Sequence, residues 1–182
     1  IGRAFYKLAS ASSDLEVVAV NDLGDPANLL YLLKYDTAYG RWDKRVNINF
    51  LQERDPAKLP WGELGVDVVV ESTGFFTEFD KANGHIVAGA KRVVITAPGK
   101  GDGATVLMGI NEEKLKTCKV SSNGSCTTNA ASPIVAIIEE ALDIEKALLD
   151  TIHSYTASQS LVDAPNTKDW REGRAAPHNI VP

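Results

Sequence analysis

Short apolar runs alternate with amphipathic segments along most of the chain. Four runs are rich in Val and Ile and nearly continuous in apolar character: residues 15–20, 66–70, 92–96 and 105–110. Strands that are buried on both faces of a parallel sheet have this pattern. Between them, residues 26–34 and 80–88 have the amphipathic character of helices. The alternation predicts an α/β fold of βαβ units.

The last third of the chain has a different pattern. Residues 130–142 place apolar side chains at helical spacing, and Pro133 is expected in the first turn of that helix, where proline is tolerated. Residues 148–155 predict one more strand. Residues 157–182 combine three prolines with mixed charges and predict a long ordered loop. Loops of this length usually serve a site or an interface.

Composition narrows the class of protein. The 182 residues are 44% hydrophobic and 24% charged, as is usual for a soluble globular protein. A net charge of -5 gives no reason to expect nucleic acid or an anionic membrane as a partner. The apolar runs are far shorter than the roughly 20 residues that span a bilayer. Two cysteines in different contexts do not make a disulfide framework, so we expect a reducing compartment and a cytoplasmic protein.

Cys126 is the strongest candidate for chemistry. It lies in the polar stretch SSNGSCTTN at residues 121–129, where the predicted helix would begin. A helix N-terminus offers free N–H groups and a positive dipole end that favour a thiolate, the nucleophilic form of cysteine. A free cysteine is more often a small buried hydrophobe, but these polar neighbours argue against that role. Cys118 lacks such neighbours, and we interpret it as structural.

His153 follows Cys126 after the predicted helix and a turn, at the end of another apolar run. A single histidine is usually a satisfied surface or core residue. Its place in the chain after Cys126 makes it a candidate base that activates the thiol. We interpret His85 and His178 as structural.

Asp22 is a candidate ligand for a dinucleotide. It follows the apolar run at residues 17–20 and lies about 20 positions beyond Gly2, the spacing at which an acidic residue binds the ribose in dinucleotide folds. A carboxylate there repels a 2′-phosphate and favours NAD over NADP. In isolation, an aspartate after a strand is more often a turn or cap residue.

These stretches resemble, in order, segments of the phosphorylating glyceraldehyde-3-phosphate dehydrogenase family. The matching segments are VND at 20–22, KYD at 34–36, QERDP at 52–56, ESTGFF at 71–76, ITAP at 95–98, SCTTN at 125–129, HSYTA at 153–157 and DWR at 169–171. The resemblance implies a Rossmann-type doubly wound NAD-binding domain at residues 1–125. It also implies the beginning of a second, α+β catalytic domain at residues 126–182.

The resemblance also assigns roles to individual residues. Cys126 would be the nucleophile and His153 its base. The cofactor NAD would be bound by Ile1, Gly2, Asp22, Arg54, Ser72, Thr73, Gly74 and Thr96. The substrate would be bound by Ser125, Thr127 and Thr156. No metal site is expected. The implied reaction is the NAD-dependent conversion of glyceraldehyde 3-phosphate and inorganic phosphate to 1,3-bisphosphoglycerate, in glycolysis and gluconeogenesis.

The same resemblance predicts a partial chain and a homotetramer. Ile1-Gly2-Arg3 resembles the tail of the family's glycine-rich fingerprint, so we expect a missing first strand, and roughly the second half of the subunit would follow Pro182. The family's hairpin between Arg41 and Phe50 is also absent. In the family, the loop after Ala157 packs against a neighbouring subunit, and Ala164-Pro165 within it is associated with NAD preference.

Two alternatives stay open. A related enzyme acting on erythrose 4-phosphate would keep the thiol, the histidine and the NAD fold. A non-catalytic NAD-binding fragment would keep only the fold. A simple cysteine hydrolase is disfavoured, because it gives no reason for Asp22 or for Ser72-Thr73-Gly74.

Overall fold

The structure is a computed structural model that describes residues 1–181, and it forms two compact units. The first unit spans Ile1–Asp143, and the second begins at Ile144. In the first unit the helices are α1 (Gly2–Ala9), α2 (Pro26–Lys34), α3 (Phe79–Ala82), α4 (Gly84–Val87) and α5 (Cys126–Leu142). Its strands are β1 (Ala19–Asn21), β2 (Tyr35–Asp36), β3 (Gly40–Arg41), β4 (Asn49–Leu51), β5 (Val68–Glu71), β6 (Arg92–Ile95), β7 (Ala104–Thr105) and β8 (Val120–Ser122). Short 3-10 helices are η1 (Pro56–Lys58) and η2 (Glu112–Lys116).

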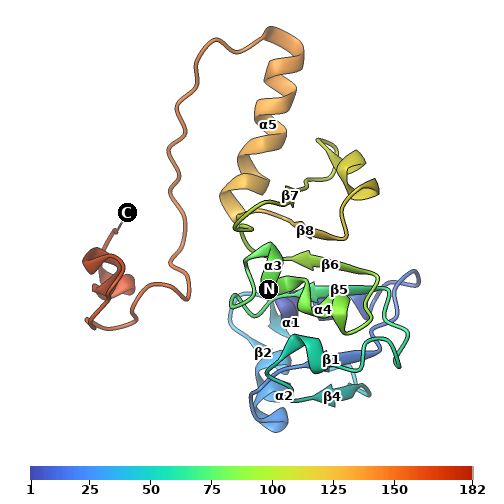
Figure 1. Cartoon of the computed structure of the whole chain (residues 1–182). Coiled ribbons are helices and arrows are strands. Elements are labelled where there is room, and N and C mark those ends of the chain that lie inside the picture. Colours follow the sequence, from blue (N-terminus) through green and yellow to red (C-terminus); the bar gives the residue numbers. More distant parts are fainter. Residues whose placement is uncertain (182) are drawn as a thin grey trace. The chain divides into compact units, whose positions relative to one another are not determined.

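The first unit is built on parallel strands, which confirms the predicted α/β class. Its main sheet has the order β5-β6-β8-β7, with every neighbouring pair parallel (Figure 1). A separate parallel pair joins β1 to β4, and β2 pairs with β3 in antiparallel fashion. The carboxyl ends of β5, β6 and β8 therefore share one edge of the main sheet, where ligands bind in folds of this class.

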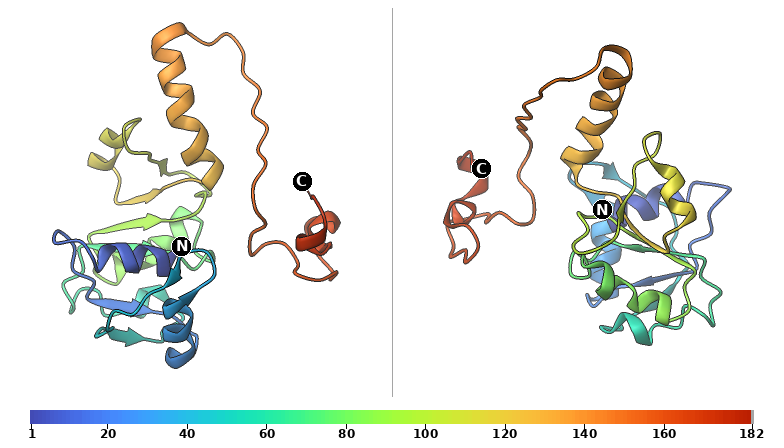
Figure 2. Two further views of the ribbon diagram at one scale, coloured as in Figure 1. Left: turned by 180° about the vertical axis from the view of Figure 1, so that it is seen from behind. Right: turned by 45° about the horizontal axis from the view of Figure 1, so that its top comes forward.

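One apolar core holds this unit together. It contains Leu59, Trp61, Val66, Val69, Phe79, Ala82, Ala90, Val93 and Ile95. Ala19 of β1 and Leu51 of β4 pack against this cluster, so the two parallel sheets share one core. Figure 2 shows α1 on one side of the main sheet and α3 and α4 on the other. Helices on both faces are the arrangement that continuous apolar strands predict.

Local sequence explains where the longer helices begin. Asp25 accepts a hydrogen bond from the N–H of Asn28 at 2.8 Å and caps α2, whose first residue is Pro26. The helix predicted at residues 80–88 exists as the two short helices α3 and α4, which meet at Asn83.

The strand predicted at residues 105–110 is mostly wrong, because only Thr105 of that run belongs to a strand, β7.

The prediction for Pro133 is also wrong in position. Helix α5 begins at Cys126, so Pro133 lies inside the helix and not in its first turn. A proline there cannot donate a backbone hydrogen bond to the preceding turn. The start of the helix at Cys126 is as predicted, and only the place of Pro133 within it differs.

The second unit has little regular structure. Among residues 144–181 it contains only the 3-10 helices η3 (Trp170–Gly173) and η4 (Ala176–His178). The strand predicted at residues 148–155 is wrong: Leu148 and Ile152 are fully exposed, and no described residue pairs with this segment. A strand needs a hydrogen-bonded neighbour, which alternating apolar residues alone do not provide. The long loop after Ala157 is present as predicted, and the boundary at residue 125 between NAD-binding and catalytic domains stays a prediction.

Among residues 1–181, every helix is too short or too polar to cross a bilayer.

Candidate active site

Three polar segments meet where the central strands of the main sheet end. Ser72 follows β5, Thr96 follows β6, and Asn123 follows β8. Thr96 Oγ1 lies 3.1 Å from Ser72 Oγ, and the N–H of Asn123 donates to the carbonyl of Ile95 at 2.9 Å. The structure therefore brings two of the predicted cofactor residues, Ser72 and Thr96, into direct contact at the ligand-binding edge.

The beginning of α1 joins this group. Gly2 is the first residue of α1, and a Cβ atom added to it would lie 3.2 Å from Ser72 Cβ. Any larger side chain would press on the turn after β5. The first N–H groups of a helix have no partner within it and form an anion site, which suits a pyrophosphate. Ile1, the N-cap residue, is exposed beside them.

Asp22 and Arg54 lie beyond the carboxyl ends of the second parallel pair. The side chain of Asn21 exchanges hydrogen bonds of 2.9 Å with the backbone of Glu53, which holds these two strand ends together. Asp22 is exposed and accepts one hydrogen bond, from the N–H of Gly24 at 2.8 Å. Its other carboxylate oxygen can accept from ribose hydroxyls. The exposed carboxylate of Asp22 thus suits the ribose contact that the sequence predicts.

A buried polar chain supports the turn at residues 72–74, and sequence analysis missed it. Trp61 Nε1–H donates to His85 Nδ1 at 3.0 Å, and His85 Nε2 lies 3.0 Å from Glu71 Oε2. Because Trp61 can only donate, His85 carries its proton on Nε2 and donates it to Glu71. The other oxygen of Glu71 accepts from the N–H and the hydroxyl of Thr73, at 2.7 and 2.5 Å. His85 is structural, as predicted; Glu71 lies in the matching segment at 71–76 but was assigned no role, and Trp61 had no signal.

These contacts set the charge of Glu71. Burial acts to raise the pKa of its carboxyl group, but hydrogen bonds from His85 and Thr73 outweigh burial and hold the pKa below its usual value of 4.5. The carboxylate thus anchors Thr73, whose hydroxyl in turn accepts from the N–H of Phe75 at 3.1 Å. Thr73 and Gly74 are exposed at the tip of this anchored turn.

Cys126 is the first residue of α5 and is exposed, as the sequence predicts. Ser125 caps the helix: its Oγ accepts from the N–H of Thr128 at 2.9 Å and lies 2.8 Å from Thr128 Oγ1. The side chain of Asn129 donates to the carbonyls of Asn123 and Ser125, at 2.7 and 2.9 Å. The turn before the thiol is therefore fixed from both sides. Thr127, beside the thiol, is half-buried.

Cys118 has a different environment. It is half-buried, and its carbonyl accepts a hydrogen bond from Arg92 Nη1 at 2.9 Å. It begins no helix. Its surroundings agree with the structural role that the sequence suggests.

His153 and Thr156 belong to the second unit, so their pairing with Cys126 stays a prediction. Both are exposed. His153 Nδ1 lies 2.8 Å from the carbonyl of Ser154, and the N–H of Thr156 donates to Gln159 Oε1 at 2.8 Å. The Thr156 hydroxyl lies 3.1 Å from Ser158 Oγ.

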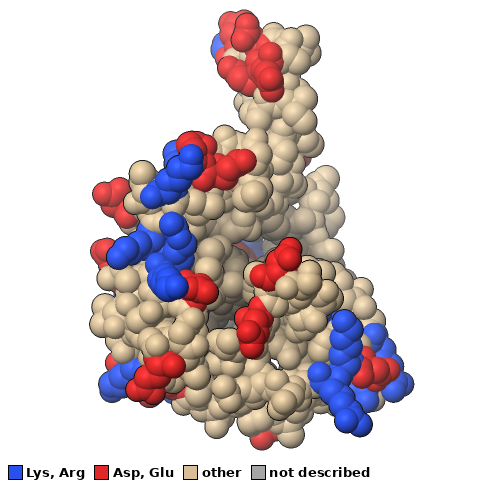
Figure 3. Space-filling model, turned by 90° about the vertical axis from the view of Figure 1, so that its right-hand side faces the viewer, with Lys and Arg blue, Asp and Glu red and all other residues tan. Residues whose placement is uncertain are grey.

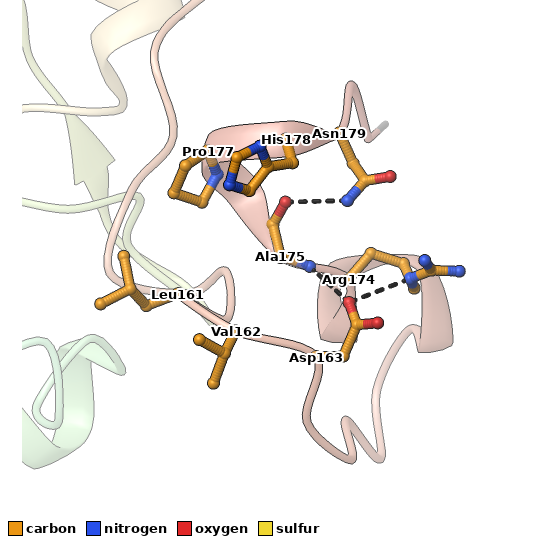
Figure 4. Close-up of a pocket in the computed structure, with 8 residues that line it drawn as sticks. All are labelled: Leu161, Val162, Asp163, Arg174, Ala175, Pro177, His178 and Asn179. Carbon is orange, nitrogen blue, oxygen red and sulfur yellow. Dashed lines mark hydrogen bonds and ion pairs between the residues drawn. The ribbon is translucent and has the colours of Figure 1, made fainter.

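The second unit has a surface hollow of its own (Figure 4). Its lining residues are Leu161, Val162, Asp163, Arg174, Ala175, Pro177, His178 and Asn179. Hydrogen bonds from the N–H of Ala175 and from Arg174 Nε, at 2.9 and 3.1 Å, hold the pKa of Asp163 below its usual value. None of the predicted site residues lines this hollow.

Two arginines of the loop form ion pairs. Arg174 binds Asp163, and Arg171 binds Asp169 with Nη2 at 2.7 Å. The guanidinium of Arg171 lowers the pKa of Asp169 to about 2. These pairs stiffen a segment that has no sheet or α-helix.

Charges are mixed on the surface. Figure 3 shows Lys and Arg side chains in small separate groups with Asp and Glu among them. Within residues 1–181, no group of His, Cys, Asp and Glu side chains could hold a metal ion.

Comparison with known proteins gives matches over most of the chain. The family model "Glyceraldehyde 3-phosphate dehydrogenase, NAD binding domain" matches residues 1–79, and the model of the C-terminal domain of the same enzyme matches residues 125–182. Similar curated proteins are the glyceraldehyde-3-phosphate dehydrogenases of Streptomyces coelicolor, 46% identical, and Geobacillus stearothermophilus, 45% identical. The cytosolic enzyme of Trypanosoma brucei brucei is 44% identical. All of this chain is covered in each comparison, but it spans only 58 to 59% of these relatives.

Proposed function

Because the chain belongs to the glyceraldehyde-3-phosphate dehydrogenase family, we propose that the intact protein is an NAD-dependent phosphorylating aldehyde dehydrogenase. Its substrates would be glyceraldehyde 3-phosphate and inorganic phosphate, and its product 1,3-bisphosphoglycerate. One observation carries the proposal: an exposed cysteine begins a capped helix at the same sheet edge as the predicted cofactor residues Ser72 and Thr96.

The thiol would perform the first step. Cys126 Sγ, as thiolate, attacks the aldehyde carbon and gives a thiohemiacetal. The N–H of Cys126 and the imidazole of His153 would stabilise the oxyanion. His153 then takes the hydroxyl proton as the carbonyl re-forms. Loss of hydride from the same carbon leaves a thioester on Cys126, and inorganic phosphate attacks it to release the acyl phosphate and the thiolate.

NAD, when bound, supplies the acceptor for that hydride. The N-terminus of α1 at Ile1 and Gly2 would bind its pyrophosphate. Asp22 would bind the ribose and, because its carboxylate repels a 2′-phosphate, would favour NAD over NADP. Arg54 would lie on the adenosine side. Thr96 and the turn at residues 72–74 would form the wall of the pocket on the nicotinamide side.

The substrate phosphate would meet hydroxyl groups near the thiol. Ser125, Thr127 and Thr156 are the candidates. Ser125 also caps α5, and the two roles are compatible because a hydroxyl oxygen can accept while its proton is donated elsewhere.

Two properties of the whole protein complete the proposal. A homotetramer would cover the loop after Ala157 and its apolar side chains, such as Leu161 and Val162, which are exposed in the single chain. The Trypanosoma relative is named as cytosolic, and we extend that location to this protein.

The test is NADH formation by the intact protein in the presence of glyceraldehyde 3-phosphate, NAD and phosphate. Cys126→Ser should abolish oxidation while NAD binding, measured by calorimetry, persists. Cys118→Ser is the matched control and should keep wild-type activity. Equal loss of NAD affinity in Cys126→Ser, or equal loss of activity in the two variants, would contradict the role assigned to Cys126.

His153→Asn supplies the second arm of the test. It should slow formation of the thioester, observed as a reduced burst of NADH in the absence of phosphate, and leave NAD affinity intact. A burst of unchanged rate would exclude His153 as the base.

A further inference from the structure

The hydroxyl group of Ser122 is a buried junction between two loops. Its side chain is fully buried, at 0% exposure. Oγ donates to the carbonyl of Ala97 at 2.6 Å and accepts from the N–H groups of Gly99 and Gly124, both at 3.0 Å. A hydroxyl has one proton to donate and two lone pairs to accept with, so every hydrogen-bonding position of Ser122 is filled within the protein.

The two loops carry the two halves of the proposed chemistry. Ala97 and Gly99 belong to the loop that begins with Thr96, on the predicted nicotinamide side. Gly124 belongs to the turn that leads into Cys126. Besides the pairing of β6 with β8 and the 2.9 Å hydrogen bond from the N–H of Asn123 to the carbonyl of Ile95, the Ser122 hydroxyl joins this loop to this turn.

The backbone of Gly99 lies close to its neighbours at this junction. A Cβ atom added to Gly99 would lie 2.9 Å from Ser122 Cβ and closer still to the ring of Phe79. Gly124 has φ +72°, a conformation that glycine adopts without strain, and its N–H points at Ser122. The hydroxyl and the close packing therefore both hold the loop against the turn.

We propose that Ser122 is a positioning residue, which fixes the loop at Thr96 relative to the turn at Cys126. The inference rests on the proposed function, because it assigns these two segments to cofactor and thiol. Hydride transfer requires the carbon held on Cys126 and the acceptor held near Thr96 to meet at a defined distance and angle. Ser122 touches neither reactant and acts only through the two backbone segments.

The test compares Ser122→Ala with Ser121→Ala in the intact protein. Ser121 precedes Ser122 on β8, is also buried at 4% exposure, and makes no side-chain hydrogen bond with any residue from 1 to 181. The same atom is removed from the same strand in both variants. Only Ser122→Ala frees the N–H groups of Gly99 and Gly124.

Three readouts are measured. In Ser122→Ala, kcat per folded molecule should fall about tenfold to a hundredfold, while the KM for NAD stays within about threefold of wild type. Hydrogen exchange of the backbone N–H groups of Gly99 and Gly124 should accelerate at least about tenfold. Ser121→Ala should match wild type in all three. A merely structural role would lower the melting temperature and the folded fraction but leave kcat per folded molecule unchanged.

The outcomes separate this inference from the proposed function. If kcat of Ser122→Ala per folded molecule equals that of Ser121→Ala in an active enzyme, Ser122 is not a positioning residue and the proposed function stands. If the wild-type protein binds no NAD and oxidises no aldehyde, the proposed function fails and this inference fails with it. If Ser122→Ala does not fold, Ser122→Cys carries the same comparison, because its thiol is a weaker donor and acceptor than the hydroxyl.

Discussion

The buried chain of Trp61, His85 and Glu71 makes Glu71→Gln a severe change despite its small size. The protons along this chain are fully determined. Trp61 gives one proton to His85 Nδ1, and His85 Nε2 gives its proton to Glu71. In Glu71→Gln an NH2 group would face the Nε2–H of His85. If the histidine proton moved to Nδ1, two donors would face each other at Trp61. If the amide turned over, its NH2 group would face another donor, the N–H of Thr73.

Every arrangement therefore leaves a donor without an acceptor: a buried one at His85 or Trp61 in two arrangements, and the partly buried N–H of Thr73 in the third. Glu71 and His85 are each only 4% exposed, so water cannot replace the lost partner. An unsatisfied buried donor costs about 1 to 3 kcal/mol, and we expect Glu71→Gln to lower the free energy of unfolding by that amount. The assay is urea unfolding of the intact protein, monitored by circular dichroism. Glu63→Gln, the same change at an exposed glutamate, is the control and should cost less than about 0.5 kcal/mol.

A double-mutant cycle with Trp61→Phe tests the assignment of donors and acceptors along this chain. Without the Trp61 donor, His85 can move its proton to Nδ1 and accept from the new amide through Nε2. Only one donor is then unsatisfied, so the double variant should cost clearly less than the sum of the two single variants. Strict additivity, or a Glu71→Gln variant as stable as Glu63→Gln, would refute the reasoning.

Three further changes test other parts of the structure. The pKa of Glu71 is lowered in the folded protein, so its contribution to stability is fully present above pH 4.5 and is lost as the pH falls toward the lowered pKa. The free energy of unfolding, measured at a series of acid pH values, should therefore change less with pH in Glu71→Gln than in the wild type. Ile95→Ala removes the largest fully buried side chain and should cost about 2 to 5 kcal/mol in urea unfolding, and a loss below 1 kcal/mol, on the scale of an Ile→Val change, would argue against this core. Gly124 and Gly65 both have positive φ, so each change to Ala should cost about 1 to 2 kcal/mol. Gly124→Ala should cost more in the same assay, because only its Cβ would meet another side chain, that of Thr128 at 2.9 Å; equal losses would contradict this packing.

The sequence was most informative where a residue's neighbours in the chain decide its structure. Cys126 begins α5 because Ser125 caps the helix through its own side chain. Asp22 directly follows β1 because the apolar run before it is continuous. Both positions were predicted correctly from short stretches, and the parallel sheet followed from the repeated apolar runs.

Features that depend on distant partners were missed or wrong. Trp61 and His85 meet Glu71 only through packing of separate elements, so no local pattern marked them. Residues 148–155 have the composition of a strand, but no residue among 1–181 pairs with them. The pairing of Cys126 with His153 is of the same kind, since the two residues lie in separate units, and it stays a prediction.

The strand order of the main sheet also sets the order in which the protein can be assembled. β8 lies between β6 and β7, although both of those strands precede it in the chain. During synthesis, the central sheet cannot close until β8 has emerged and entered between two strands that were made earlier. Parallel pairing between such distant segments forms slowly. Because β8 ends at Ser122, the turn that holds Cys126 takes shape only in this closing step, and a nascent or partly folded chain carries the thiol without its surroundings.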